Sequence, residues 1–299
     1  MYREHYGLVR LPFEMTPDPA MLYLGESHRE GLATLVYGVQ AGKGFVVITG
    51  EVGTGKTTLL HALLGQLDAS TASAFIFNPK LEPLDFFRLL FDEYGIEHSC
   101  RTKAEFLMGL NHYLIERLTR DEKTLLIVDE AQALPPDMLE EIRLLSNLET
   151  PTSKLLQIML VGQPELNEVL AQPELRQLRQ RVVLRHNLRP FDEKELADYI
   201  DERLTLAGYT GKGIFNKSAQ REIFRVTAGV PRLVNIVCDG ALLQGYAQGA
   251  TTVGSDVIRE VARDLHLTGV EGEFTQDGPS EDEEPQRRRS GRWRWRRRR

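Results

Sequence analysis

The stretch that decides the fold is Phe45-Val-Val-Ile-Thr-Gly50-Glu-Val-Gly-Thr-Gly-Lys56-Thr57. Its first four residues, Phe45–Ile48, form an apolar run with the length of a buried strand, and residues 50–57 match the pattern G-x-x-x-x-G-K-[ST]. Glycines in this pattern let successive backbone N–H groups point into one concavity, which attracts phosphate together with a helix N-terminus. Because the match lies between an expected strand (45–49) and an expected helix (56–67), we interpret it as a phosphate-binding loop rather than a coincidence.

The loop predicts that the chain binds ATP with Mg²⁺. We expect Lys56 to reach the β- and γ-phosphates and the hydroxyl of Thr57 to ligate the magnesium ion. The other contacts to the nucleotide should come from the rest of the loop and the residue that follows it, namely Gly50, Glu51, Val52, Gly53, Thr54, Gly55 and Thr58.

A second apolar strand, 124–128, ends in the acids Asp129 and Glu130. Strand ends of this kind lie at the edge of the sheet where ligands bind in open α/β folds. We expect Asp129 to hold Mg²⁺ through its water and Glu130 to polarise the attacking water as a general base. A base next to the metal-binding acid favours hydrolysis over a small-molecule kinase reaction. The alternative is a pair of solvated acids at a strand end.

The remaining pattern predicts an α/β fold in which a parallel sheet is covered on both faces. Apolar segments indicate strands at 45–49, 74–77, 124–128, 155–161 and 182–188, and amphipathic segments indicate helices at 56–67, 103–120 and 136–148. After Pro190 the strands stop, and four helices are expected at 192–207, 217–228, 231–248 and 255–267. Asp192 and Ser255 occupy expected N-caps, and helix ends are expected at Gly208, Gly229 and Gly249.

The amino-acid composition limits the classes of protein to which the chain can belong. With 299 residues, 41% of them hydrophobic and 27% charged, the chain reads as soluble and globular, which excludes collagen-like, disulfide-scaffold and wholly disordered proteins. The two cysteines, Cys100 and Cys238, belong to no ligand cluster, so we expect both to be buried in a reducing compartment. The sequence has no secretory signal and no apolar stretch long enough to span a bilayer, which predicts a cytoplasmic protein.

The charge is divided unevenly along the chain. The last 14 residues contain nine arginines and both tryptophans, so residues 1–285 carry 28 basic against 43 acidic side chains, a net of −15. An acidic run at 271–284 precedes this end, and we expect residues 268–299 to be disordered. Arginine with tryptophan suits an anionic membrane or nucleic acid, and the alternative is an unselected low-complexity end.

Several further motifs accompany the loop and the acidic pair. They are Tyr6-Gly-Leu, Pro12-Phe13, Thr16-Pro-Asp-Pro19, Leu22-Tyr23, His28, Asn78-Pro-Lys-Leu81, Ile142–Thr150, Gly162-Gln-Pro-Glu-Leu166, Leu175–Arg181 and Gly229-Val-Pro-Arg232. Together they resemble the AAA+ ATPases of the general-secretion-pathway protein A (ExeA) type over residues 1–267. Related ATPases accompany exosortase and polysaccharide-export systems, and others assist DNA transposition.

The resemblance implies a P-loop NTPase sheet with an AAA+ core, followed by a small all-α lid domain. It divides the chain into an N-terminal segment packing near the nucleotide (1–40), the P-loop domain (41–190), the lid (191–267) and the tail (268–299). Pro12 and Phe13 fall where the family's N-terminal segment passes the adenine, with apolar core packing as the alternative. The secretion ATPases continue into a membrane-spanning helix and a periplasmic peptidoglycan-binding domain, whereas this sequence has the acidic run and Arg292–Arg299 instead.

The resemblance also assigns three polar side chains. Gln163 takes the sensor 1 position near the γ-phosphate, the alternative being a loop glutamine bonded to backbone. Arg232 takes the sensor 2 position, and its place at a helix N-terminus, unfavourable for a cation, argues for an anion nearby rather than a plain surface arginine. Arg181, with Arg176 as second choice, is the expected finger that completes a neighbouring subunit's site. The arginines of 176–189 could instead form a solvated or polyanion-binding face.

Three functions follow as hypotheses. The first is a homo-oligomeric ATPase that hydrolyses ATP to ADP and phosphate, as a switch or motor for assembly of a secretion or cell-envelope export system. It would have an export-system or membrane-associated protein as partner and a cytoplasmic location peripheral to the inner membrane. The second is a nucleic-acid-associated regulator of the transposition-helper or initiator kind, and the third is a nucleotide-dependent scaffold without turnover. The acidic body and the absence of an appended winged helix weigh against the second.

Overall fold

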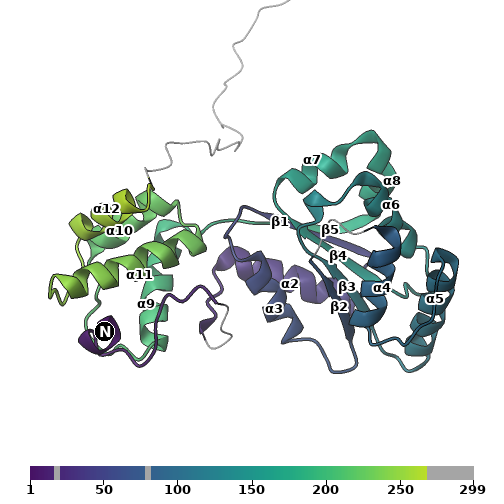
Figure 1. The fold of residues 1–299 in the computed structure, drawn as a ribbon, viewed down its shortest axis with the longest axis horizontal. Helices are drawn as coiled ribbons and strands as arrows, with labels where there is room; N and C mark the ends of the chain where they lie inside the picture. The colour runs from purple at the N-terminus through teal and green to yellow at the C-terminus, as the bar shows by residue number, and fades with distance from the viewer. Residues whose placement is uncertain (17–20, 78–81, 268–299) are drawn as a thin grey trace, which may run out of the picture.

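The computed structural model describes residues 1–16, 21–77 and 82–267, and the chain forms two lobes (Figure 1). One lobe is built around a parallel sheet, and the other contains only helices. The chain passes from the first to the second after β5, while its N-terminal residues lie against the helical lobe. The expected disordered tail, with its arginines and tryptophans, and the motif Asn78–Leu81 lie outside the described residues.

The sheet has five parallel strands in the order β2-β3-β4-β1-β5. Their bounds are Phe45–Gly50 (β1), Ala72–Ile76 (β2), Thr124–Val128 (β3), Gln157–Gly162 (β4) and Val182–Leu188 (β5). Phe45 pairs with Ile158 of β4, and Leu126 pairs with the same residue from β3. All residues of β1, β3 and β4 are buried, as their unbroken apolar runs predict. The three strands that carry the loop, the acidic pair and Gln163 are therefore neighbours.

Helices cover both faces of this sheet, because successive strand residues point to opposite sides. One face packs against α2 (Glu26–Gln40) and α3 (Lys56–Leu64). The other packs against α4 (Pro83–Glu93), α5 (Lys103–Thr119), α6 (Pro136–Leu145), α7 (Glu165–Ala171) and α8 (Arg176–Arg181). Two short 3₁₀ turns, η2 (Ala131–Ala133) and η3 (Pro173–Leu175), follow β3 and α7. The expected α/β class is confirmed.

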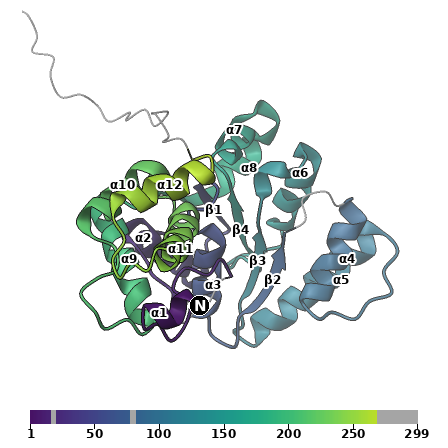
Figure 2. The ribbon, with the colours of Figure 1, turned by 60° about the vertical axis from the view of Figure 1, so that its left-hand side comes forward.

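The helical lobe contains α9 (Glu193–Leu206), α10 (Lys217–Thr227), α11 (Pro231–Ala247) and α12 (Ser255–Asp264). The short helix α1 (Tyr2–His5) lies beside α11, as Figure 2 shows. The hydroxyl of Tyr2 donates to Asp239 of α11, and Tyr6, Leu8 and Phe13 join the same apolar core. The lobe is thus built from both ends of the described chain.

Local signals in the sequence mark several of the helix boundaries. Asp192 caps α9 as expected, because its carboxylate accepts from the backbone N–H of Glu195 at 2.7 Å. The expectation for Ser255 is wrong by one residue, since Gly254 is the N-cap and Ser255 the first helical residue. Positive φ angles follow three of these helices, 88° at Gly208, 74° at Gly229 and 66° at Gly249, so the expected glycine ends are confirmed.

Two further expectations bear on the rest of the chain. Cys238 is buried as expected, whereas Cys100 is only half-buried beside the core of the α/β lobe. Across the described ranges, none of the helices combines the length and the apolar character needed to cross a membrane.

Candidate active site

The phosphate-binding loop connects β1 to α3. Its backbone has positive φ at Gly53 (80°) and Gly55 (98°), conformations that glycine adopts without strain. Thr54 is fully buried, and its hydroxyl donates to the carbonyl of Glu51 at 2.8 Å, which closes the loop on itself. The backbone therefore holds the concave form that a phosphate needs, and the free N–H groups at the start of α3 face it.

Lys56 is the buried cation of this loop. Its Nζ donates to the carbonyl oxygens of Gly50 at 2.6 Å and Glu51 at 3.0 Å. Burial lowers the pKa of Lys56, and the carboxylates of Glu130 and Asp129 partly oppose that shift. The ammonium is thus held over the loop by backbone acceptors that a phosphate could replace.

Thr57 and Asp129 form the oxygen pair next to Lys56. The hydroxyl of Thr57 donates to Oδ2 of Asp129 at 3.4 Å, and Oδ1 of Asp129 accepts from the N–H of Glu130 at 2.8 Å. Burial raises the pKa of Asp129 above its ordinary value, so a cation beside it would be strongly favourable. Hydroxyl and carboxylate oxygens are the donors that Mg²⁺ prefers, so these two residues fit a magnesium site.

Glu130 is held by two side-chain amides. Its Oε2 accepts from Nε2 of Gln132 at 2.6 Å and from Nε2 of Gln163 at 3.2 Å. The backbone of Glu130 is left-handed, with φ 51° and ψ 36°, a conformation that is costly for a residue with a side chain. Gln163 thus contacts the expected base directly, as a sensor near the γ-phosphate would.

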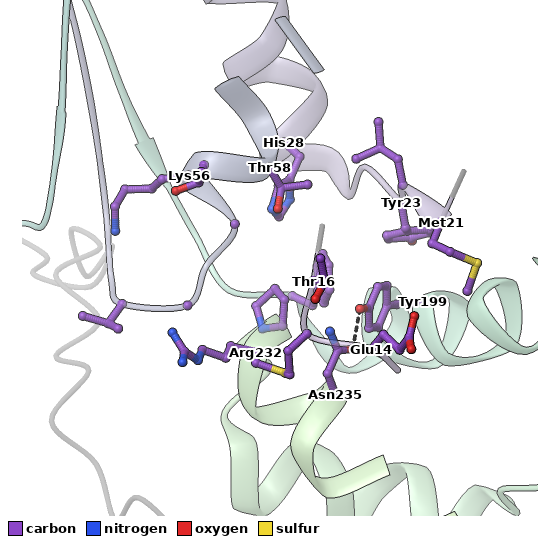
Figure 3. Close-up of a pocket in the computed structure, with 18 of the residues that line it drawn as sticks. Glu14, Thr16, Met21, Tyr23, His28, Lys56, Thr58, Tyr199, Arg232 and Asn235 are labelled. Carbon is purple, nitrogen blue, oxygen red and sulfur yellow. Dashed lines mark hydrogen bonds between the residues drawn. The ribbon is translucent and has the colours of Figure 1, made fainter. Parts of the chain in front are cut away.

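A cavity of about 390 Å³ lies over the loop, between the two lobes. Figure 3 shows Lys56, His28 and Thr58 on the side of the α/β lobe, with Arg232 and Asn235 facing them from the helical lobe. Its walls include the site residues predicted at Val52, Gly53, Gly55, Lys56, Thr57, Thr58, Glu130, Gln163 and Arg232. Asp129 lies beneath the cavity, bonded to Thr57. Gly50, Glu51 and Thr54 shape the loop but are absent from the walls described.

The N-terminal segment closes the cavity through residues 14–16 and 21–23. Arg203 of α9 holds this segment in place. Its buried guanidinium donates to the carbonyls of Pro12 at 2.5 Å, Met21 at 3.1 Å and Glu14 at 3.4 Å. Pro12 and Phe13 themselves do not line it. Phe13 is buried in the helical lobe against Phe215, so core packing is the better interpretation of that residue.

His28 connects α2 to the loop. Its Nε2 lies 2.8 Å from the carbonyl oxygen of Thr54, and because a carbonyl only accepts, Nε2 carries the proton. The ring is buried beside Phe191, and burial lowers the pKa of His28. A neutral His28 therefore supports the loop from α2.

Arg181 lies away from this cavity. Its guanidinium donates to Asn147 at 2.7 Å, to the carbonyl of Arg143 at 3.3 Å and to the hydroxyl of Ser146, all at the C-terminal end of α6. A cation there satisfies helix carbonyls that would otherwise be unpaired. Arg176 and Arg179 are exposed on α8. The assignment of a finger to Arg181 stays a prediction, and its intramolecular bonds favour Arg176 for a role toward a neighbouring subunit.

Sequence reasoning missed several residues that the fold brings to the site. Gln132, two residues after Glu130, is visible in the sequence as an amide beside the acidic pair. Tyr199 and Arg203 are four residues apart and share one face of α9, but nothing local indicates what that face meets. Asn235, one turn after Arg232, accepts from the hydroxyl of Tyr199 at 2.5 Å (Figure 3).

Comparison with known proteins bears on the family and the fold of this chain. A family model described as an AAA domain matches residues 39–170. General secretion pathway protein A of Aeromonas hydrophila is 43% identical over 276 residues, which cover 92% of this chain and 50% of that protein. The chain thus spans about half the length of the curated relative that it matches.

Solved structures support the fold. Cdc6p from Pyrobaculum aerophilum matches with a TM-score of 0.64 at 18% identity, covering 85% of this chain and 70% of that one. ORC2 from Aeropyrum pernix, solved with ADPNP and ADP, gives a TM-score of 0.62 at 16% identity and covers 85% and 71%. A point mutant of RuvB from Thermotoga maritima gives 0.53 at 18% identity and covers 84% and 74%. At these identities the likeness concerns the fold alone.

Proposed function

We propose that this chain, which belongs to the AAA+ ATPases of the general-secretion-pathway protein A type, hydrolyses ATP to ADP and phosphate with Mg²⁺. The observation that carries the proposal is convergence: Lys56 from the loop after β1, Glu130 from the end of β3 and Arg232 from α11 line one cavity. A cation for the phosphates, a carboxylate for water and a second cation on the lid are the groups that phosphoryl transfer to water requires.

The proposed reaction uses each group once. Lys56 and the loop N–H groups bind the β- and γ-phosphates, and Glu130 accepts the proton of the attacking water through its carboxylate. Thr57 and Asp129 would hold magnesium, which neutralises phosphate charge when it is bound. Arg232 lies where a lid cation can stabilise the charge that develops on the γ-phosphate, and this explains a cation at a helix N-terminus.

Two variants test the assignment. Lys56→Ala should abolish binding of a fluorescent ATP analogue, because the phosphates lose their mobile cation. Glu130→Gln should bind the analogue as the wild type does while steady-state phosphate release falls by about 10²–10⁴-fold, since only water activation is lost. Wild-type turnover in Glu130→Gln would show that Glu130 is not the base.

The proposal also includes a cellular role for the ATPase. We infer that the ATPase acts as a homo-oligomeric switch or motor in assembly of a secretion or cell-envelope export system, at the cytoplasmic side of the inner membrane. Its support is the 43% identity to a protein named for general secretion, although half of that protein lies beyond the match. Pull-down of an envelope protein by Glu130→Gln with ATP, but not by Lys56→Ala, would support it. Equal capture by both variants would contradict it.

A second candidate is nucleic-acid binding, favoured by the exposed arginines 176, 179 and 189 on α8 and after β5. Charge of this kind would contact phosphates without reading sequence. The measurement is DNA affinity with and without ATP, on the full chain and on a chain ending at Thr268. ATP-independent binding that disappears with the tail would exclude a role for these arginines.

A further inference from the structure

Gln132 lies beside the proposed base without lining the nucleotide cavity. It belongs to η2, the short turn after β3, and is half-buried. Its Nε2 donates to Oε2 of Glu130 at 2.6 Å, and its own Oε1 accepts from the backbone N–H of Gln163 at 3.1 Å. One side chain therefore connects the carboxylate at the end of β3 with the backbone at the end of β4.

The amide of Gln132 lies against Gly162 of β4, which has no side chain to occupy that space. A Cβ added to Gly162 would lie 2.5 Å from Oε1 of Gln132 and 3.2 Å from the side chain of Leu166. Any larger residue at 162 would displace the amide or α7. The pocket for the Gln132 amide is thus bounded by Gly162, the N–H of Gln163 and the carboxylate of Glu130.

The two amides act on the same oxygen of Glu130. Gln132 at 2.6 Å and Gln163 at 3.2 Å both donate to Oε2 rather than to Oε1. The backbone of Glu130 is left-handed, so its carboxylate direction depends on these restraints rather than on a relaxed helix or strand. Neither amide donates to Oε1, so that oxygen stays able to accept a proton.

We propose that Gln132 is a positioning residue for hydrolysis. It fixes the carboxylate of Glu130 relative to β4, so that Oε1 meets the attacking water at the required distance and angle. The inference rests on the proposed function, in which Glu130 is the base. Because Gln132 is absent from the cavity walls, its loss should lower kcat while leaving nucleotide binding unchanged.

Two substitutions separate the hydrogen bonds of Gln132. Gln132→Met keeps the length of the side chain and removes both bonds, and kcat should fall about 10–100-fold with KM within about twofold. Gln132→Glu keeps the acceptor for Gln163 but places a second carboxylate beside Glu130, and kcat should fall at least as far. Asn167→Ala is the matched control, because it removes an exposed amide on α7 that contacts Thr49 and not Glu130. It should keep wild-type kcat.

A third variant disturbs the amide of Gln132 without changing Gln132 itself. Gly162→Ala places a methyl group against Oε1 of Gln132, so the same loss of kcat at constant KM is expected even where Gln132→Met folds poorly. Circular dichroism melting of each variant accompanies the kinetics.

The deciding comparison is a double-mutant cycle with Glu130→Gln. If Gln132 acts through the base, Gln132→Met should cause no further loss of phosphate release in the Glu130→Gln background. An equal fold-loss in both backgrounds, or wild-type kcat in Gln132→Met, would overturn the role of Gln132 while the ATPase assignment stands. Absence of ATP turnover in the wild-type protein would overturn both.

Discussion

The backbone N–H of Arg232 donates to the carbonyl oxygen of Gly53 at 3.2 Å. This bond joins the first turn of α11 to the phosphate-binding loop through main chain alone. Gly53 has no space for a side chain here, since an added Cβ would lie 2.8 Å from the Cβ of Arg232. The lid therefore contacts the loop by a bond that remains when Arg232 is replaced by any residue other than proline, which has no backbone N–H.

The first prediction follows because the backbone bond of Arg232 and its side-chain charge can be tested separately. Arg232→Ala should leave ADP affinity within about threefold of the wild type, because the backbone bond remains, while ATP turnover falls about 10²–10³-fold with the loss of one cation. Isothermal titration with ADP and steady-state phosphate release measure the two effects. Arg232→Lys, which keeps the charge, should recover part of the turnover. Unchanged turnover in Arg232→Ala would remove Arg232 from the reaction.

The second prediction concerns Arg203. Arg203→Met leaves three backbone carbonyls of the N-terminal segment without their donor, so the free energy of unfolding should fall by about 2–4 kcal/mol. Nucleotide affinity should also fall, because residues 14–16 and 21–23 wall the cavity. Urea unfolding and titration with ADP measure both. Arg221→Met, an exposed ion-pair residue, is the control and should change neither. Loss of stability with full affinity would refute the link to the cavity.

The third prediction is a dependence of stability on pH. Burial lowers the pKa of His28 below the 6.5 of the free side chain, so the unfolded chain binds its proton more readily. The stability that neutral His28 contributes is therefore present above pH 6.5 and is lost as the pH falls through the lowered folded-state pKa. His28→Gln should show a shallower fall in unfolding free energy between about pH 7 and pH 5. Identical slopes in urea unfolding would contradict it.

The fourth prediction distinguishes the two candidate fingers. Arg181→Ala should lower stability by about 1 kcal/mol, because the end of α6 loses its guanidinium, whereas exposed Arg176→Ala should not. If Arg176 completes a neighbouring site, mixing Arg176→Ala with Glu130→Gln should restore some ATP turnover that neither has alone. Rescue by Arg181→Ala instead would return the finger to Arg181. No rescue by either would exclude a shared site built on these residues.

Local patterns predicted the parts of the fold that depend on neighbouring residues. Strands β3 and β5 have the predicted bounds, because unbroken apolar or alternating runs suit strands and little else at that length. A few adjacent residues determine the conformation of the glycine-rich loop, and the same holds for the cap at Asp192. The helix α2 was not predicted, since its N-cap is Gly25, which has no side chain to mark a helix start.

The missed site residues depend on contacts between distant segments. Arg203 meets carbonyls about 190 residues earlier in the chain, and no spacing within α9 indicates them. Asn235 likewise reaches the site only after the two lobes have packed, whereas His28 meets the carbonyl of Thr54 within the α/β lobe. Gln132 is the exception, because it follows the acidic pair by two residues, but its role depends on the adjacent strand β4.

The bond between Tyr2 and Asp239 joins residues 237 positions apart, and this separation sets an order of events during synthesis. A ribosome releases the N-terminal segment first, yet the helices that bury Tyr2, Tyr6 and Phe13 emerge last. The sheet can close once β5 has been made, whereas the opening residues must wait for α11 as a long-range partner. A nascent chain halted before α11 would therefore expose aromatic side chains at its start. Its phosphate-binding loop would also lack the residues of α11 that face it.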